Sequence, residues 1–120
     1  MGYYTKFELE ISGTGERWVT GVNVKGEKIR VNIGIDHDEV IRELVDLSGY
    51  EHLFDGDTHK WYEYDENMRE ISQKYPNLLF TLSGEGEESG DRWRAYYKAG
   101  KCQRELAKIE YGKFDPALLK

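Results

Sequence analysis

The fold of this chain is decided by residues 77–111, NLLFTLSGEGEESGDRWRAYYKAGKCQRELAKIEY. The stretch divides into three segments, residues 77–84, 91–98 and 101–111, separated by turns that contain glycine. The connection at residues 99–100 is short enough for a tight hairpin. The stretch therefore predicts three consecutive antiparallel strands.

Further strands are predicted upstream of this stretch. Residues 3–12 alternate apolar and polar side chains, which is typical of a half-buried strand. Residues 17–24 predict a weaker strand, which Gly21 interrupts, whereas apolar and polar side chains alternate in residues 27–35. Lys25-Gly26 between them favours a hairpin connection. Residues 61–64, Trp-Tyr-Glu-Tyr, predict one short extended piece.

Two helices are predicted between these strands. Asp36 is placed to cap the first helix, Glu39 completes a capping-box pattern, and Gly49 ends the helix. Asp65 is placed to cap the second helix, which Pro76 terminates because proline cannot continue a helix. Each helix carries an apolar stripe that needs a sheet to cover it.

The order of these elements predicts an α+β, ferredoxin-like two-layer sandwich, in which two helices cover one face of an antiparallel sheet. A chain of 120 residues suits a single domain spanning residues 1–120. The last seven residues, FDPALLK, are expected to pack Phe114, Leu118 and Leu119 back on the core.

Composition excludes several classes of function. The formal net charge of −6 disfavours general adhesion to DNA or to anionic membranes. Cys102 is the only cysteine, so an intrachain disulfide and a CxxC zinc site are both excluded. No apolar run approaches the ~20 residues that cross a bilayer. We therefore expect a soluble cytoplasmic protein with no membrane partner.

The acidic segment SGEGEESGD, residues 83–91, is the most distinctive motif. Its carboxylates are Glu85, Glu87, Glu88 and Asp91. They give the wrong field for a phosphate cradle, which needs backbone N–H groups or basic side chains. Calcium would accept some of these oxygens, but the EF-hand spacing is absent. The segment predicts a solvated hairpin turn, whose charge is suited to docking a basic partner or imitating nucleic-acid phosphates.

A second acidic segment spans residues 51–70. The loop within it offers His52, Asp55, Asp57 and His59, all of which have metal-competent side chains. The two imidazoles match no established ligand spacing, so we expect a solvated loop and predict no metal or cofactor. A metal-dependent enzyme remains an alternative. The sequence contains no GxSxG elbow and no HExxH motif. We therefore expect no catalysis.

The strand DRWRAYYK, residues 91–98, suggests another function. Alternation places Arg92, Arg94, Tyr96 and Lys98 on one side, opposite Trp93. Basic residues around an aromatic ring bind single-stranded nucleic acid through phosphate pairing and base stacking. Acidic residues on neighbouring strands, such as Glu8, Glu10 or Glu105, would instead neutralise the arginines across the ladder. Nucleic-acid binding is therefore an alternative function.

The chain also resembles a family of small uncharacterised phage, prophage and bacterial proteins. The resemblance rests on the Met-Gly-Tyr-Tyr-Thr start, Trp61-Tyr62, Tyr75-Pro76, residues 84–88 and residues 90–93. The helix, Tyr-Pro, strand and hairpin order is more distantly similar to the YubB-type ferredoxin-like domain. The resemblance implies a ferredoxin-like fold and a mobile-element setting, and implies no catalytic residues.

These observations together predict a non-catalytic binding protein. In a phage setting, the sharper expectation is an anti-CRISPR-like or anti-restriction inhibitor that binds a host defence nuclease or effector. The acidic turn is the first candidate for the partner-binding site, and Asp55 with Asp57 is the second. An exposed Trp61 or Tyr62 is expected to supply the apolar anchor that specificity needs.

Overall fold

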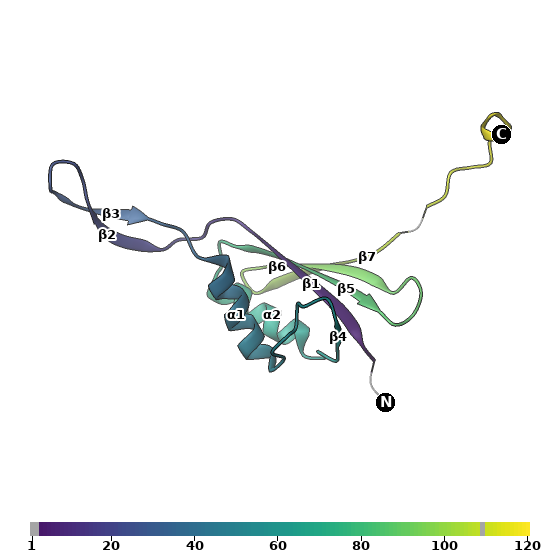
Figure 1. Cartoon of the computed structure of the whole chain (residues 1–120), viewed down its shortest axis with the longest axis horizontal. Helices are drawn as coiled ribbons and strands as arrows, with labels where there is room; N and C mark the ends of the chain where they lie inside the picture. The colour runs from purple at the N-terminus through teal and green to yellow at the C-terminus, as the bar shows by residue number, and fades with distance from the viewer. Residues whose placement is uncertain (1–2, 109) are drawn as a thin grey trace.

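The centre of the protein is a five-stranded antiparallel sheet, shown in a computed structural model that describes residues 3–108 and 110–120 (Figure 1). Its strands lie in the order β4-β1-β5-β6-β7. Their bounds are β1 Thr5–Ser12, β4 Thr58–His59, β5 Leu79–Gly86, β6 Arg92–Lys98 and β7 Lys101–Leu106. The meander β5-β6-β7 confirms the three consecutive strands that the sequence predicts.

Two helices, α1 (His37–Ser48) and α2 (Tyr64–Lys74), lie on the same side of this sheet (Figure 1). Both helices lie between β1 and β5 in the sequence, and these two strands are neighbours in the sheet. The α+β class with antiparallel strands and two helices is therefore confirmed. Among the described residues, no helix is long and apolar enough to span a bilayer.

The ends of α1 agree with the sequence in two of three respects. The Asp36 carboxylate accepts the Asp38 backbone N–H at 3.0 Å, and Gly49 ends the helix in the left-handed region at φ 79°. Glu39 was predicted to complete a capping box. Its carboxylate instead lies 3.3 Å from the Arg17 guanidinium, so it serves an ion pair outside the helix.

The start of α2 corrects two expectations. Residues 61–64 do not form a strand, because the chain turns at residues 62–63 and the helix begins at Tyr64. Asp65 does not cap this helix. It lies inside the first turn, where its carboxylate accepts hydrogen bonds from Tyr97 at 2.9 Å and from Arg69 at 2.9 Å.

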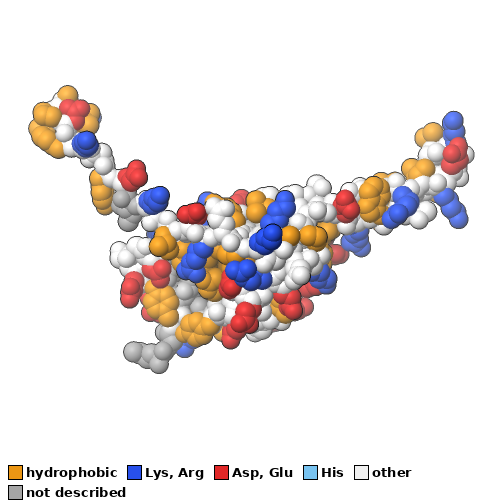
Figure 2. Space-filling view, turned by 180° about the vertical axis from the view of Figure 1, so that it is seen from behind, with side chains coloured by type: hydrophobic (Ala, Val, Ile, Leu, Met, Phe, Trp, Pro, Cys, Tyr) orange, Lys and Arg blue, Asp and Glu red, His pale blue; other side chains and the backbone are white. Residues whose placement is uncertain are grey.

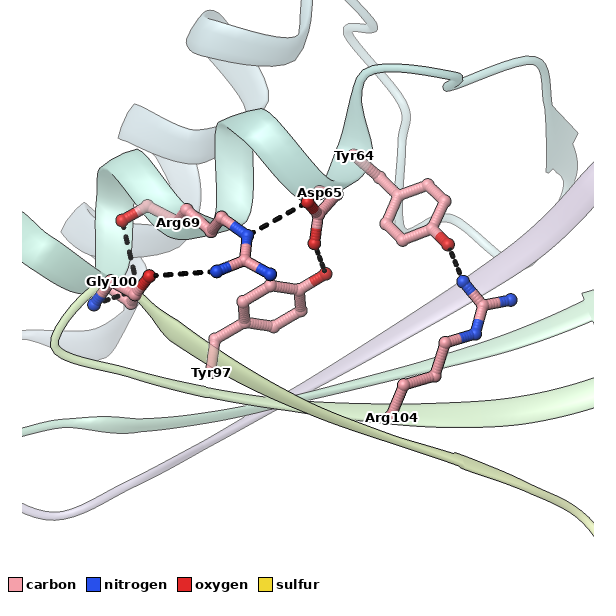
Figure 3. Close-up of polar contacts among 7 residues, drawn as sticks. Tyr64, Asp65, Arg69, Tyr97, Gly100 and Arg104 are labelled. Atoms are coloured by element: carbon pink, nitrogen blue, oxygen red, sulfur yellow. Dashed lines mark hydrogen bonds and ion pairs between the residues drawn. The ribbon is translucent and has the colours of Figure 1, made fainter.

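Asp65 helps to clasp α2 onto the β6–β7 hairpin (Figure 3). Arg69 donates to the Gly100 carbonyl at 3.3 Å, and the Gly100 N–H donates to Ser72 Oγ at 3.0 Å. Burial raises the pKa of Asp65, but the hydrogen bonds from Arg69 and Tyr97 outweigh it, and the net shift is downward. Helix α2 is thus joined to the β6–β7 turn through Arg69 and Ser72, and to β6 through the Tyr97 hydroxyl.

The core lies between the helices and the covered face of the sheet. Its buried apolar residues are Phe7, Val40, Leu44, Leu53, Trp61, Met68, Ile71, Leu78, Phe80, Leu82, Trp93, Ala95 and Tyr97. Aromatic rings dominate one end, where Trp93 stacks on Tyr64 with centroids 4.9 Å apart. Burial at this scale stabilises the fold by about 25 cal/mol for each square ångström of apolar surface removed from water.

The predicted hairpin of residues 17–35 forms, but outside the central sheet. Its strands, β2 (Trp18–Val22) and β3 (Lys28–Asn32), make a separate two-stranded sheet that projects from one end of the protein (Figure 1). The projection accounts for much of the elongated shape, which measures 72 × 46 × 24 Å. The radius of gyration is 20.1 Å. A compact domain of this length would have about 14 Å.

The C-terminal segment also departs from the prediction. Strand β7 ends at Leu106, five residues before the predicted end at Tyr111. Beyond it the chain extends away from the sheet at the end opposite the hairpin, and finishes with a short 3-10 turn at Pro116–Leu118 (Figure 1). Phe114, Leu118 and Leu119 are exposed, so their expected packing on the core is wrong.

Candidate functional site

The acidic segment forms a solvent-exposed turn between β5 and β6. The Gly86 N–H donates to the Asp91 carbonyl at 2.8 Å, and the Asp91 N–H donates to the Glu88 carbonyl at 3.1 Å. Gly90 has φ 85°, a left-handed conformation that glycine adopts without strain. Glu85, Glu87 and Glu88 are exposed, while Asp91 is half-buried. The sequence-based prediction of a hairpin turn is therefore confirmed.

The four carboxylates of this turn have different partners. Glu85 is the one acidic residue of β5, and its carboxylate pairs with the Arg92 guanidinium across the ladder at 3.0 Å. Glu87 accepts the Tyr4 backbone N–H at 3.0 Å. Asp91 accepts a hydrogen bond from the Tyr3 hydroxyl. The charge of Glu85 is thus neutralised locally, whereas Glu87 and Glu88 form no ion pair among the described residues.

Tyr3 connects the acidic turn to a second aromatic residue. Its hydroxyl also accepts the Glu88 N–H at 3.2 Å, and its backbone N–H donates to the Tyr62 hydroxyl at 2.8 Å. The hydrogen bond to Asp91 raises the pKa of Tyr3, because ionised Tyr3 would lose that donor and face the carboxylate charge. The segment before β1 therefore holds Tyr62 beside the turn.

These contacts define one surface, made of Tyr4, Tyr62, Glu87 and Glu88 and supported by Tyr3 and Asp91. We call it the tyrosine–carboxylate surface. Tyr62 is 60% exposed and Tyr4 is 42% exposed. The Lys60 ammonium lies 4.7 Å from the Tyr4 ring centroid, so a cation already occupies part of this surface. Sequence reasoning missed Tyr3 and Tyr4, since only their pairing across the fold brings them to the turn.

Trp61 does not belong to this surface. Its side chain is 1% exposed and packs against Phe7 with ring centroids 5.2 Å apart. Its indole N–H donates to Asn67 Oδ1 at 2.7 Å, which satisfies the only polar atom of the ring. The expectation that Trp61 is an exposed anchor is wrong, because the turn at residues 62–63 directs this ring into the core. Of these two neighbouring residues, only Tyr62 is exposed.

The loop of residues 52–59 is organised by its own backbone. Asp55 accepts the Asp57 N–H at 2.9 Å, and His59 Nε2 lies 3.5 Å from the same carboxylate oxygen. The hydrogen bond from the Asp57 backbone lowers the pKa of Asp55. His52 is exposed, and the described part of the chain brings together no group of three metal-competent side chains. β4 joins this loop to β1 on the edge opposite β5, since Thr5 pairs with both His59 and Gly86.

The other sequence-derived candidate lies on the uncovered face of the sheet. Trp93 and Tyr97 face the helices, so the alternate residues of β6 point away from them. These are Arg92, Arg94, Tyr96 and Lys98. The structure therefore brings the four residues together on the open face, as alternation predicts.

Acidic side chains interrupt this open face. Facing residues in the ladders place five basic side chains, Lys6, Arg92, Arg94, Lys98 and Lys101, among four acidic ones, Glu8, Glu10, Glu85 and Glu105. A shallow hollow of about 500 Å³ lies between β1 and β7 on this face. Arg94 lies opposite Glu105 in the register and within 3.4 Å of Ser83 Oγ. Because positive and negative side chains alternate on this face, a partner with charges of both signs fits it better than a polyanion does.

Comparisons of this chain with protein-family models, with curated proteins and with solved structures find no match. The resemblance to small phage and prophage proteins thus stays a prediction from sequence motifs. The functional argument consequently depends on the chemistry of the described surfaces.

Proposed function

We propose that this protein is a non-catalytic binding protein that docks a basic protein partner on the tyrosine–carboxylate surface. The observation that carries the proposal is the double contact of Tyr3, whose hydroxyl meets Asp91 and whose backbone N–H meets Tyr62. This contact fixes an exposed aromatic ring beside two carboxylates, Glu87 and Glu88, that form no ion pair within the described part of the chain. Anchoring aromatics with a charged rim are typical of protein-binding surfaces.

The carboxylates and the tyrosine ring of this surface contribute to binding in different ways. Glu87 and Glu88 supply exposed negative charge that steers a basic partner and sets its orientation. Tyr62 offers an apolar ring with a polar tip, a combination that buries area at a small entropic cost. The hydrogen bonds of Tyr3 hold both groups in place before binding, so that less freedom is lost on association.

The sharper proposal concerns the partner. In a phage or mobile-element setting, a basic nucleic-acid groove of a host defence nuclease or effector is the matching target, as for an anti-CRISPR-like or anti-restriction inhibitor. Carboxylates at the turn would occupy positions that phosphates take in such a groove. We also propose that the fold is a variant of the ferredoxin-like type. The element order here differs from β-α-β-β-α-β, because both helices lie between β1 and β5.

The experiment compares charge reversals at two sites. Tagged wild-type protein is used to capture partners from a bacterial lysate, and the captured proteins are quantified by mass spectrometry. Glu87→Lys/Glu88→Lys should lose the basic partner, and Tyr62→Ala should weaken its capture by at least about tenfold. Glu8→Lys/Glu10→Lys makes the same change in net charge on the open face and should retain the partner. Equal loss from both double variants would contradict the assigned surface.

Single-stranded nucleic-acid binding is the second candidate, favoured by the shared open face of Arg92, Arg94, Tyr96 and Lys98. The near balance of charges on that face is the argument against it. Titration with a labelled single-stranded oligonucleotide at low and raised salt decides the matter. Salt-sensitive binding that Arg92→Ala/Arg94→Ala abolishes would support this function, whereas no binding at low salt would remove it.

A further inference from the structure

The projecting hairpin β2–β3 has one wholly apolar face. In its register Val19 lies opposite Val31, and Gly21 lies opposite Ile29. Side chains that face each other across a pair share a side of the sheet, so these four residues form one surface. The other side carries Trp18, Thr20 and Val22 with Lys28 and Arg30. The hairpin therefore has one apolar face and one face that mixes apolar and basic side chains, and we call the hairpin the arm.

The arm exposes this apolar face to solvent. Val19, Ile29 and Val31 are 37%, 40% and 38% exposed, and Trp18 on the other side is 50% exposed. Orange side chains are visible on this projection as well as on the body in Figure 2. Two-stranded hairpins are marginally stable in water without a packing partner. An uncovered apolar ribbon therefore indicates a surface that covers it.

The base of the arm is firmly attached. The Ile35 N–H donates to the Thr14 carbonyl at 2.6 Å, and the Ile33 N–H donates to the Arg17 carbonyl at 2.9 Å. Arg17 also pairs with Glu39 of α1 at 3.3 Å. These contacts hold the arm outward from its own helices, as Figure 1 shows, so the arm does not reach its own helical layer. A covering surface must come from another molecule.

The opposite charges of the arm and of the helical layer indicate that this other molecule is a second copy of the chain. Arg17 already pairs with Glu39 of its own α1, and residues 18–33 carry three basic side chains against Glu27, a net charge of +2. Residues 36–75, which contain both helices, carry twelve acidic and four basic side chains, a net charge of −8. Two arms stacked on each other would repel, whereas an arm on the helical layer of a second copy would be attracted. The complementary surface is thus present on this chain itself.

The helical layer also contains a hollow suited to the arm. A groove of about 500 Å³ lies between α1 and α2, lined by Glu43, Asp46, Leu47, Glu70, Ile71 and Lys74. Leu47 is an exposed apolar residue of α1 beside this groove. Lys74 neutralises Glu43, whereas Asp46 and Glu70 take part in no ion pair among the described residues. The groove is thus lined by two apolar and three acidic side chains, with one basic side chain beside them.

We propose that two copies of this chain exchange arms, each laying the apolar face of its hairpin in the α1–α2 groove of the other. Such an exchange is isologous, because each copy gives one arm and receives one, and it closes as a dimer. The site is distinct from the tyrosine–carboxylate surface, so the proposal stands whether or not that surface binds a partner.

Oligomeric state is measured by analytical ultracentrifugation of the full chain over a concentration series. We expect a dimer whose dissociation constant rises with salt. Val31→Glu, on the apolar face, should raise that constant by at least about tenfold. Thr20→Glu adds the same charge on the opposite face of the arm and should raise the constant much less, because it lowers the net charge of the arm by one unit and places no carboxylate against the groove. Circular dichroism checks that each variant keeps its fold, since the arm lies outside the core.

A charge swap tests the pairing of arm with groove. One variant carries Lys28→Glu/Arg30→Glu in the arm, and the other carries Asp46→Lys/Glu70→Lys at the groove. Each alone should dimerise poorly, because its arm and groove then have like charges, while the mixture should form a heterodimer. A wild-type monomer at every concentration would overturn the proposal. So would a mixture that fails to associate, or a dimer lost in Val31→Glu but indifferent to the groove changes.

Discussion

The hydroxyl of Tyr97 donates a hydrogen bond to Asp65 Oδ1 at 2.9 Å and so joins β6 to the first turn of α2. Burial is the main cause that raises the pKa of Tyr97, and the Asp65 hydrogen bond adds to it. Tyr97→Phe removes the donor and leaves Asp65 with Arg69. We expect the free energy of unfolding to fall by about 1–2 kcal/mol, measured by urea denaturation.

Tyr96→Phe is the matched control for this change. Tyr96 is the neighbouring residue of β6 and points to the open face, where its hydroxyl makes no hydrogen bond among those of the described residues. Its removal should change stability by less than about 0.5 kcal/mol. Equal losses from the two substitutions would show that the Tyr97 hydroxyl does not stabilise the clasp.

Tyr75 should make the stability of the fold depend on pH in the alkaline range. Its hydroxyl donates to Glu43 at 2.6 Å, and this bond raises the Tyr75 pKa from 10.0 to about 12. The folded state therefore keeps a proton that the unfolded chain loses. The stabilisation is complete below pH 10.0 and disappears as pH rises to about 12.

The test compares wild type with Tyr75→Phe. Unfolding free energy is measured across the alkaline range, and tyrosinate absorbance follows the ionisation directly. Wild type should lose more stability than the variant between these two pH values, since Tyr97 and the other tyrosines remain in both proteins. Parallel curves would show that the Tyr75–Glu43 bond does not shift the ionisation.

Gly84 makes room for the Trp93 ring. The two residues face each other in the β5–β6 register, and a Cβ at Gly84 would meet the indole. The ring is held by Tyr64 on which it stacks and by the Arg104 guanidinium 4.6 Å away, so it has little space to move. Gly84→Ala should destabilise the protein by about 1–3 kcal/mol through overpacking.

Gly112→Ala provides the comparison, since a Cβ there meets nothing within 4 Å and the residue does not have a positive φ. This change should be close to neutral. Denaturant unfolding reports both effects, and tryptophan emission should shift only in Gly84→Ala. A neutral Gly84→Ala would mean that the indole finds another position.

Trp61 and Tyr62 are adjacent but should respond in opposite ways. Trp61→Ala empties a fully buried site and should cost about 3–5 kcal/mol of stability. Tyr62→Ala removes an exposed ring and should leave stability nearly unchanged while reducing capture of the partner. Thermal unfolding and the capture assay separate the two effects. Loss of capture with full stability in a folded Trp61→Phe variant would reopen the role of Trp61.

Local patterns predicted the elements whose deciding signals lie within a short stretch of sequence, even where the neighbouring strand is remote, as it is for β1. Alternation in residues 3–12 gave β1, the Asp36 and Gly49 signals gave α1, and the short connection at residues 99–100 gave the β6–β7 hairpin. In each case the deciding interactions are a cap, a tight turn or side-chain alternation, all of which a short window contains. The open-face position of Arg94 followed from the same alternation.

Contacts between distant segments decided what local patterns missed. The carboxylate of Asp65 was assigned to a helix cap because the sequence does not show that Tyr97 lies within reach. Trp61 seemed exposed because the turn that buries it depends on the packing of Phe7 and Phe54. Tyr3 entered the candidate site only because β1 pairs with β5.

The pairing of β1 with β5 has a consequence for how the protein is made. Thr5 pairs with Gly86 and Ser12 with Leu79, so β1 leaves the ribosome well before the strand that it pairs with. Its residues Phe7, Leu9 and Ile11, which pack in or against the core of the folded protein, lack the β5 part of that packing until β5 is made. Pairings between such remote segments slow folding, because a long loop must close before they form. The yield of this protein should therefore depend on translation speed and on the supply of chaperones.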